Sequence, residues 1–297
     1  MATARLIDGK AIAAQIHSET KTRVQALKER HRIIPGITFV RVGEDPASRA
    51  YVRMKGARAE ELGICSDTIV LHEATPQAEL LALIEKLNRD PKIHGILVQA
   101  PLPKQIREDE IFSAIDCHKD VDGFHPVNVG KLLLGQNPLF KPCTPAGVHE
   151  LLIRSGLPIR GAEVVILGRG NIVGKPMAAI LLQKDTHADA TVTLLHSRSQ
   201  NIAGHCRRAD ILIAAMGQAH FVKADMVKPG ATVIDVGVNR IDDPQAKNGY
   251  RLVGDVDFDA VSQVAGAITP NPGGVGPMTI AMLLSNTVRA AELASGP

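Results

Sequence analysis

The sequence predicts an α/β protein with two domains, both built from strands that alternate with helices. The chain of 297 residues is long enough for a sizeable core and for two domains. Short β-rich or apolar runs alternate with helical stretches through both halves, and this alternation is typical of a parallel sheet covered by helices. In the second half an apolar strand runs directly into a glycine-rich loop, an arrangement found in dinucleotide-binding domains.

The first half contains three expected helices and three expected strands. Apolar residues recur at helical spacing from Ile12 to Leu27, and a leucine stripe marks the third helix. Pro101 and Pro103 end the last strand, because proline cannot donate to a strand ladder. The helices are expected over residues 9–30, 48–63 and 77–88, and the strands over 37–42, 64–71 and 93–99.

The second half repeats the pattern from Thr144 onward. Its apolar runs predict four strands with helical connections, and an amphipathic final helix is expected to pack back on the first domain. The strands are expected over residues 163–167, 190–195, 209–215 and 231–238, and the helices over 145–152, 174–182, 201–208 and 278–293.

The composition narrows the class of protein. A net charge of +3 and 3% aromatic residues argue against nucleic-acid binding, which needs basic patches and stacking side chains. Four cysteines without a CxxC pair, and histidines without an HExxH motif, argue against a metal site and fit reduced thiols in the cytoplasm. No apolar run approaches the length of a membrane span, so no membrane partner is expected.

The glycine-rich loop after the strand at 163–167 indicates a bound nucleotide. Gly168, Gly170 and Gly174 give the spacing GxGxxxG, and glycines let a backbone approach a pyrophosphate at a helix N-terminus. The pattern alone is weak, because a structural turn uses the same residues. Its position after an apolar strand favours the nucleotide.

The residues that follow the next strand indicate whether the nucleotide is NAD or NADP. NAD-specific sites usually carry a carboxylate there, whereas this chain has Ser197 and Arg198. A hydroxyl beside a guanidinium suits a 2′-phosphate, and Arg169 adds a second cation. NADP is therefore preferred over NAD. The alternative is that Ser197 and Arg198 form a solvated turn.

A tyrosine and a lysine on one helix are the first candidates for chemistry. Tyr51 and Lys55 are four residues apart and share a helix face. Burial or neighbouring cations lower the pKa of a lysine and make it a usable acid or base. Taken alone, such a pair is more often an exposed surface feature.

Three further segments place polar groups or a ligand cradle at element ends. Gln99 ends a strand at the edge where open α/β sheets bind ligands, and Asp122 could hold a ring edge through paired hydrogen bonds. The segment 272–280 holds three glycines and two prolines and leads into a helix, which makes it a shaped loop and a natural cradle. A strand cap, an Asx turn and a structural turn are the alternatives.

Six segments, taken in order, resemble the bifunctional methylenetetrahydrofolate dehydrogenase/methenyltetrahydrofolate cyclohydrolase family. The resemblance implies a catalytic, folate-binding domain at residues 1–143 with 275–297, and a Rossmann-like NADP-binding domain at 144–274. It also implies a homodimer, and it implies both activities of one-carbon metabolism: oxidation of 5,10-methylenetetrahydrofolate and hydrolysis of the methenyl product. The matching segments are 51–55, 95–103, 119–126, 142–145, 168–176 and 272–280.

The same resemblance implies a role for each matching residue. Lys55 would be the acid/base group of the hydrolysis, Tyr51 would pack on the folate ring, Gln99 would orient Lys55, and Asp122 would hold the pterin edge. The folate pocket would be lined by Ser48, Cys143, Pro272 and Gly273. The cofactor would be bound by Gly168, Arg169, Gly170, Ser197 and Val238.

Two departures from the family pattern leave alternatives open. The family usually has serine where this chain has Gly170, and leucine where it has Ala100. An enzyme with only the dehydrogenase or only the cyclohydrolase activity is one alternative, and a catalytically silent nucleotide-binding regulator is another. The presence of Lys55 and Asp122 favours an active enzyme.

Overall fold

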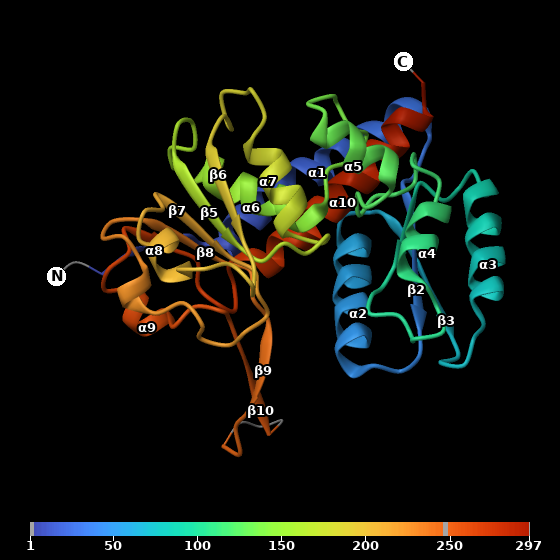
Figure 1. Ribbon diagram of the computed structural model, residues 1–297. Coiled ribbons are helices and arrows are strands. Elements are labelled where there is room, and N and C mark those ends of the chain that lie inside the picture. Colours follow the sequence, from blue (N-terminus) through green and yellow to red (C-terminus); the bar gives the residue numbers. More distant parts are fainter. Residues whose placement is uncertain (1–2, 246–248, 297) are drawn as a thin grey trace. The chain divides into compact units, whose positions relative to one another are not determined.

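The computed structural model describes residues 3–245 and 249–296 and contains two compact units (Figure 1). Among the described residues, unit 1 comprises residues 3–13 and Thr144–Thr279, and unit 2 comprises residues 14–143 and 280–296. Helix α1 (Gly9–His31) begins in unit 1 and continues in unit 2. This geometric division places residues 3–13 and 275–279 in unit 1, whereas the boundaries expected from the sequence assign them to the folate-binding domain. Those functional boundaries remain a prediction.

Unit 2 is built on a three-stranded parallel sheet with the order β3-β2-β4. The central strand β2 (Gly36–Val42) is buried along its whole length, as is typical of the middle strand of a parallel sheet covered on both faces. It pairs with β3 (Cys65–Leu71) and β4 (Gly95–Val98). The helices of this unit are α2 (Pro46–Glu61), α3 (Gln77–Arg89), α4 (Glu108–Ala114) and α5 (Pro126–Leu133).

Alternate residues of β2 enter two different cores. Ile37 and Phe39 belong to a core with α2 and the last helix, α10 (Val275–Ala294), whereas Val40 and Val42 belong to a core with α3 and α4. This follows from the two-residue period of a strand. The expected sheet and its helices on both faces are therefore confirmed for unit 2.

The C-terminal helix packs within unit 2, as the sequence predicts. Leu283, Leu284 and Val288 of α10 are fully buried in the core that contains Phe39. Near the end of the helix, Glu292 forms an ion pair of 2.7 Å with Arg23 of α1. The last segment of the chain thus completes the core of a unit whose other residues precede position 144.

Unit 1 contains a six-stranded parallel sheet with the order β1-β11-β8-β7-β5-β6. Strand β5 lies between the next two strands of the sequence, so the chain reverses its direction of winding at the carboxyl ends of β5 and β7. The strands are β1 (Arg5–Leu6), β5 (Glu163–Leu167), β6 (Thr191–Leu195), β7 (Ile211–Ala214), β8 (Thr232–Asp235) and β11 (Ala267–Ile268). The helical segments are α6 (Cys143–Arg154), α7 (Gly174–Leu181), α8 (Ile202–Cys206), η1 (Ala224–Met226) and α9 (Phe258–Val261). The Rossmann-like arrangement is confirmed.

A two-stranded antiparallel hairpin projects from the sheet of unit 1 (Figure 1). It consists of β9 (Asn239–Asp242) and β10 (Tyr250–Val253) and carries a cation–π contact in which the Arg240 guanidinium lies 4.0 Å from the Tyr250 ring centre. The sequence did not predict this hairpin, nor α4, α5, α9 and the two-residue strands. No helix among the described residues is long and apolar enough to cross a membrane.

Candidate active site

Lys55 owes its position to the way helix α2 begins. Asp45 caps the helix by accepting a hydrogen bond of 2.7 Å from the amide of Ser48, and Pro46 occupies the first turn, where no amide donor is needed. The helix then turns Ser48 and Lys55 inward, so both are buried, while Tyr51 on the same face is half-buried. A lysine in a helix of unit 2 is therefore held away from water.

Gln99 fixes the lysine amine. Its Oε1 accepts a hydrogen bond of 3.0 Å from Lys55 Nζ, and its Nε2 donates 2.7 Å to the carbonyl of Ala100. The amide of Gln99 continues the β4 ladder by donating 2.8 Å to the carbonyl of Val40. Because the side-chain amide is held at both ends, its oxygen faces the lysine. The structure thus brings Lys55 and Gln99 together.

The surroundings of Lys55 change its acid strength. Burial lowers the pKa of Lys55 below the ordinary lysine value, and this effect outweighs the opposing influence of Asp122 and Cys143. A lowered pKa increases the fraction of neutral amine near neutral pH. The neutral amine is able to accept a proton from water, which a lysine on the protein surface rarely does.

Asp122 lies in a turn that a neighbouring carboxylate shapes. Asp120 accepts backbone hydrogen bonds from Gly123, Phe124 and His125 at 3.2, 3.1 and 2.8 Å. Gly123 has a φ of +83°, and a Cβ there would lie 2.6 Å from the nitrogen of Pro142, so the turn requires glycine. Burial raises the pKa of Asp122, and the neighbouring Lys55 and Cys143 act in the opposite direction.

Cys143 is buried beside the turn that carries Asp122, in surroundings that do not favour a thiolate. Its thiol is buried and donates 3.2 Å to the carbonyl of Val121, and Asn286 Nδ2 lies 3.6 Å from the sulfur. Burial and the carboxylate of Asp122 raise the pKa of Cys143 well above the ordinary thiol value, which keeps the group neutral. Asn286 also donates 2.8 Å to the carbonyl of Val121 and so links α10 to this turn.

In unit 1, the loop after β5 packs its backbone closely against the end of β7. Gly168 has a φ of +113°, and a Cβ on it would overlap the carbonyl of Ala215 at the end of β7. Helix α7 begins at Gly174, six residues further on. Arg169 and Gly170 are exposed between them. The loop therefore lies at the point of winding reversal, where open α/β sheets bind nucleotides.

The other predicted cofactor residues lie at the same edge of the sheet. Ser197 and Arg198 are exposed in a turn after β6, and Val238 is exposed after β8. Within the described chain, neither Arg169 nor Arg198 has an ion-pair partner. Two cations, a hydroxyl and a glycine cradle fit a phosphorylated dinucleotide, because each is available to a phosphate. Parallel strands bring their carboxyl ends to one edge, so the five predicted residues share it.

The sequence analysis did not identify a pair of buried carboxylates that organise this edge. Asp255 accepts hydrogen bonds from the amides of Met216, Gly217 and Gln218, at 2.6, 3.0 and 2.9 Å. Its other donor is the side chain of Asn239, at 2.8 Å. The three amides lie in the loop that follows β7, and Asn239 is the first residue of β9. Asp255 is fully buried and therefore links that loop to the start of β9.

Asp235, at the end of β8, supports Asp255 in turn. Its Oδ1 accepts from the amides of Asp255 at 2.9 Å and Gly237 at 3.0 Å, and its Oδ2 accepts from Val256 at 3.2 Å. Burial raises the pKa of Asp235 to about 6, and the three amides act in the opposite direction. The run Asp235-Val236-Gly237 and the dipeptide Gly254-Asp255 are visible in the sequence, but nothing local connects them.

The remaining two predicted residues, Pro272 and Gly273, lie in a turn of unit 1 directly before α10. Gly273 has a φ of +110°, as the glycine-rich segment led us to expect of a shaped loop. The structure thus groups the site residues by unit. Ser48, Tyr51, Lys55, Gln99, Asp122 and Cys143 lie in unit 2, and Gly168, Arg169, Gly170, Ser197, Val238, Pro272 and Gly273 lie in unit 1.

The two halves of the chain match the two domains of one known protein family. Residues 7–122 match the model of the tetrahydrofolate dehydrogenase/cyclohydrolase catalytic domain, and residues 142–295 match that of the NAD(P)-binding domain of the same family. Bifunctional protein FolD of Prosthecochloris aestuarii is 56% identical over 286 residues, which cover 96% of this chain and 97% of that protein.

Two solved structures are also similar over their full lengths. The bifunctional enzyme FolD of Campylobacter jejuni is 48% identical with a TM-score of 0.92, covering 98% of this chain and 99% of that one. The Trypanosoma brucei methylenetetrahydrofolate dehydrogenase-cyclohydrolase, complexed with NADP and an inhibitor, is 40% identical with a TM-score of 0.95 and full coverage of both chains. This chain therefore belongs to the tetrahydrofolate dehydrogenase/cyclohydrolase family.

Proposed function

We propose that this protein oxidises 5,10-methylenetetrahydrofolate reversibly to 5,10-methenyltetrahydrofolate with NADP⁺ and hydrolyses the product to 10-formyltetrahydrofolate. Membership of the family supports both activities. The observation that carries the hydrolytic half is the buried Lys55, with its lowered pKa and its hydrogen bond to Gln99. Following NADPH formation and methenyltetrahydrofolate consumption separately tests the two halves.

The hydrolysis needs a base and no metal. The methenyl carbon is cationic and electrophilic, so a water oxygen adds to it while Lys55 takes the proton. The proton then passes to the ring nitrogen as the carbon–nitrogen bond breaks, and the hydroxyl oxygen releases its remaining proton to solvent as it becomes the carbonyl. The formyl group is left on the other nitrogen. Gln99 orients the amine, Asp122 holds the pterin edge, and Tyr51 packs on the ring. Ser48, Cys143, Pro272 and Gly273 line the folate pocket in this proposal.

NADP is the cofactor that the residues of unit 1 fit best. Gly168, Arg169 and Gly170 would hold its phosphates, Ser197 with Arg198 its 2′-phosphate, and Val238 would lie beside the nicotinamide. The cofactor supplies the hydride acceptor for the oxidation. The unpaired state of Arg169 and Arg198 among the described residues supports this proposal, because neither guanidinium must leave a carboxylate before it binds phosphate.

The rate of hydrolysis is expected to rise with pH. The base is the neutral amine of Lys55, and its pKa is lowered, so the active form accumulates as pH rises toward that lowered value and the rate then levels off. The oxidation transfers a hydride and does not use the neutral amine as a base, so its rate serves as the internal control. A pH–rate profile for methenyltetrahydrofolate hydrolysis checks this. A rate that falls across the neutral range would contradict a neutral lysine base.

Replacing Gly170 by serine is expected to strengthen NADP binding. A Cβ at Gly170 meets no heavy atom within 4 Å, and the residue has no positive φ, so a side chain fits without strain. The added hydroxyl can donate to a phosphate oxygen, which is worth about 1 kcal/mol or a fivefold lower dissociation constant. Calorimetric titration with NADP⁺ measures the change, and Gly170→Ala is the matched control without the hydroxyl. Equal affinities for the two variants would sink the prediction.

One alternative is an enzyme that hydrolyses methenyltetrahydrofolate but does not oxidise its precursor. The missing hydroxyl at Gly170 favours it, because the phosphates of NADP lose one donor there. Absence of NADPH formation at saturating NADP⁺, together with intact hydrolysis, would select this alternative. A silent regulator would show neither activity.

Domain roles, assembly and location complete the proposal. We assign folate chemistry to residues 1–143 with 275–297 and NADP binding to residues 144–274. We also assign a homodimeric state and a cytoplasmic location. The four cysteines are free thiols, which fits the reducing cytoplasm. Light scattering after size exclusion measures the assembly.

A further inference from the structure

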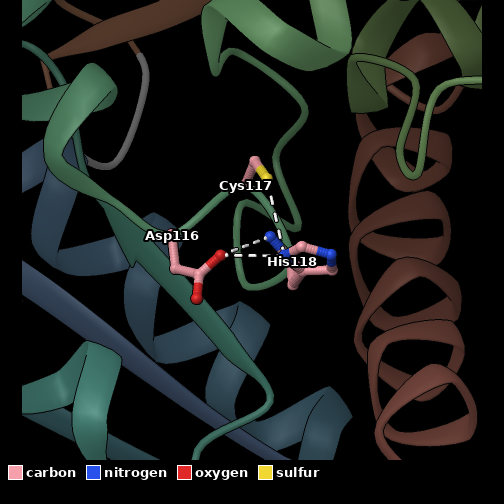
Figure 2. A group of neighbouring side chains, drawn as sticks. All are labelled: Asp116, Cys117 and His118. Carbon is pink, nitrogen blue, oxygen red and sulfur yellow. Dashed lines mark hydrogen bonds and ion pairs between the residues drawn. The ribbon is translucent and has the colours of Figure 1, made fainter.

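The loop between α4 and α5 brings three different metal-binding side chains to one point. Figure 2 shows the side chains of Asp116, Cys117 and His118 converging from consecutive positions. His118 Nδ1 lies 3.0 Å from Asp116 Oδ1 and 3.5 Å from Cys117 Sγ. The three donor atoms lie within 4.8 Å of one another. A search for separated motifs such as CxxC or HExxH misses them, because the ligands are adjacent.

The separations fit the coordination sphere of zinc. Zinc binds thiolate sulfur at about 2.3 Å and imidazole nitrogen at about 2.0 Å, so donors at tetrahedral angles lie roughly 3.3–3.6 Å apart. The sulfur–nitrogen separation of 3.5 Å falls in this range. The nitrogen–oxygen separation of 3.0 Å is slightly short, and a small rotation of the exposed His118 ring opens it. Thiolate, imidazole and carboxylate together suit a borderline divalent cation.

The backbone of the loop is already fixed by other contacts. Asp116 accepts the amide of His118 at 2.9 Å on its carboxylate and the amide of Lys119 at 2.7 Å on its carbonyl. Asn128 of α5 donates 3.1 Å to the carbonyl of Cys117. Only exposed or half-buried side chains must adjust when an ion binds, so little ordering opposes binding.

We infer that this loop binds a borderline divalent cation of the Zn²⁺ class through Cys117 Sγ, His118 Nδ1 and a carboxylate oxygen of Asp116, with water as the fourth ligand. Metal binding displaces the thiol proton of Cys117 to solvent, because thiolate is the form of cysteine that binds zinc. The competing interpretation is an ordinary Asx turn with a histidine–aspartate hydrogen bond. In that interpretation the sulfur makes only a hydrogen bond of 3.5 Å to His118 Nδ1.

Cobalt is the probe that separates the two interpretations. The fully reduced, full-length protein is titrated with Co²⁺ while the thiolate-to-cobalt charge-transfer absorption is followed, and Zn²⁺ is then added. We expect one Co²⁺ per chain and loss of the absorption as Zn²⁺ displaces it. Cys117→Ser should abolish the absorption, and His118→Ala should raise the half-saturating concentration at least tenfold, about 1.4 kcal/mol.

Cys65 provides the matched control. It is an exposed free cysteine in β3, and Cys65→Ser should leave the absorption unchanged. No charge-transfer absorption in the wild type at millimolar Co²⁺, or an absorption that survives Cys117→Ser, overturns the inference. Loss of the absorption in Cys65→Ser also overturns it, since the thiolate would then lie elsewhere. Thermal melting of each variant verifies that a lost signal reflects a lost ligand.

Discussion

Replacing Lys55 by methionine is expected to slow the hydrolysis of methenyltetrahydrofolate by about 10²–10⁴-fold, the usual contribution of a positioned acid/base group. Methionine has nearly the same length and suits a buried position, so the fold should persist. The hydride transfer does not use the amine as a base and should keep most of its rate. Stopped-flow absorbance of the methenyl group measures the hydrolysis, and NADPH absorbance measures the oxidation.

Lys28 provides the control for this substitution. It lies exposed near the end of α1 in the same unit, and Lys28→Met removes the same charge without touching the site. Both rates should stay within twofold of the wild type. Hydrolysis in Lys55→Met that equals hydrolysis in Lys28→Met would remove Lys55 from the mechanism.

Replacing Asp255 by alanine is expected to destabilise unit 1 by about 3 kcal/mol and to weaken NADP binding. The carboxylate accepts four hydrogen bonds, from Met216, Gly217, Gln218 and Asn239, and alanine leaves all four donors without an acceptor. Three of these donors lie in the loop after β7 at the cofactor edge, so its loss of order should reach the bound nucleotide. Urea unfolding gives the stability, and calorimetric titration with NADP⁺ gives the affinity.

Asp259 offers the matched substitution. It is exposed in the first turn of α9, four residues along the chain, and Asp259→Ala should change the free energy of unfolding by less than about 0.5 kcal/mol. Asp255→Asn should fall between the two, because one amide oxygen can replace only one carboxylate oxygen as an acceptor. Wild-type stability and NADP affinity in Asp255→Ala would show that the four bonds have no such role.

The sequence predicted best the elements whose ends carry a local signal. Strand β5 has the expected bounds because an apolar run stops at Gly168, and α2 differs by two residues because Pro46 extends its first turn. Strand β8 ends at Asp235, three residues before the expected end, because the Asp235 carboxylate binds the amide of Gly237 and bends the chain. Strands β1 and β11 have two residues each, too few to form a pattern.

The candidate site was also predicted only where a residue carries a local sequence signal. A strand end and a helix face marked Gln99 and Lys55 as separate candidates, and only the family resemblance implied that they meet. Their hydrogen bond joins residues 44 positions apart. The burial that lowers the pKa of Lys55 depends on packing and cannot be read from spacing. The sequence did not reveal the role of Asp255, because its hydrogen-bond donors lie 16 to 39 positions away and its neighbours in the chain form no motif.

The return of α10 into unit 2 has a consequence for biosynthesis. During translation, the first 143 residues leave the ribosome long before Leu283, Leu284 and Val288, which fill the core around Phe39. Part of the apolar core surface of unit 2 therefore stays exposed to solvent until the chain is released. All of the strands of unit 1 have been synthesised once the chain reaches Ile268, so the sheet of unit 1 can be completed before the core of unit 2. A chain that ends just after residue 279 would keep the sheet of unit 1, but unit 2 would lack the helix residues that complete its core.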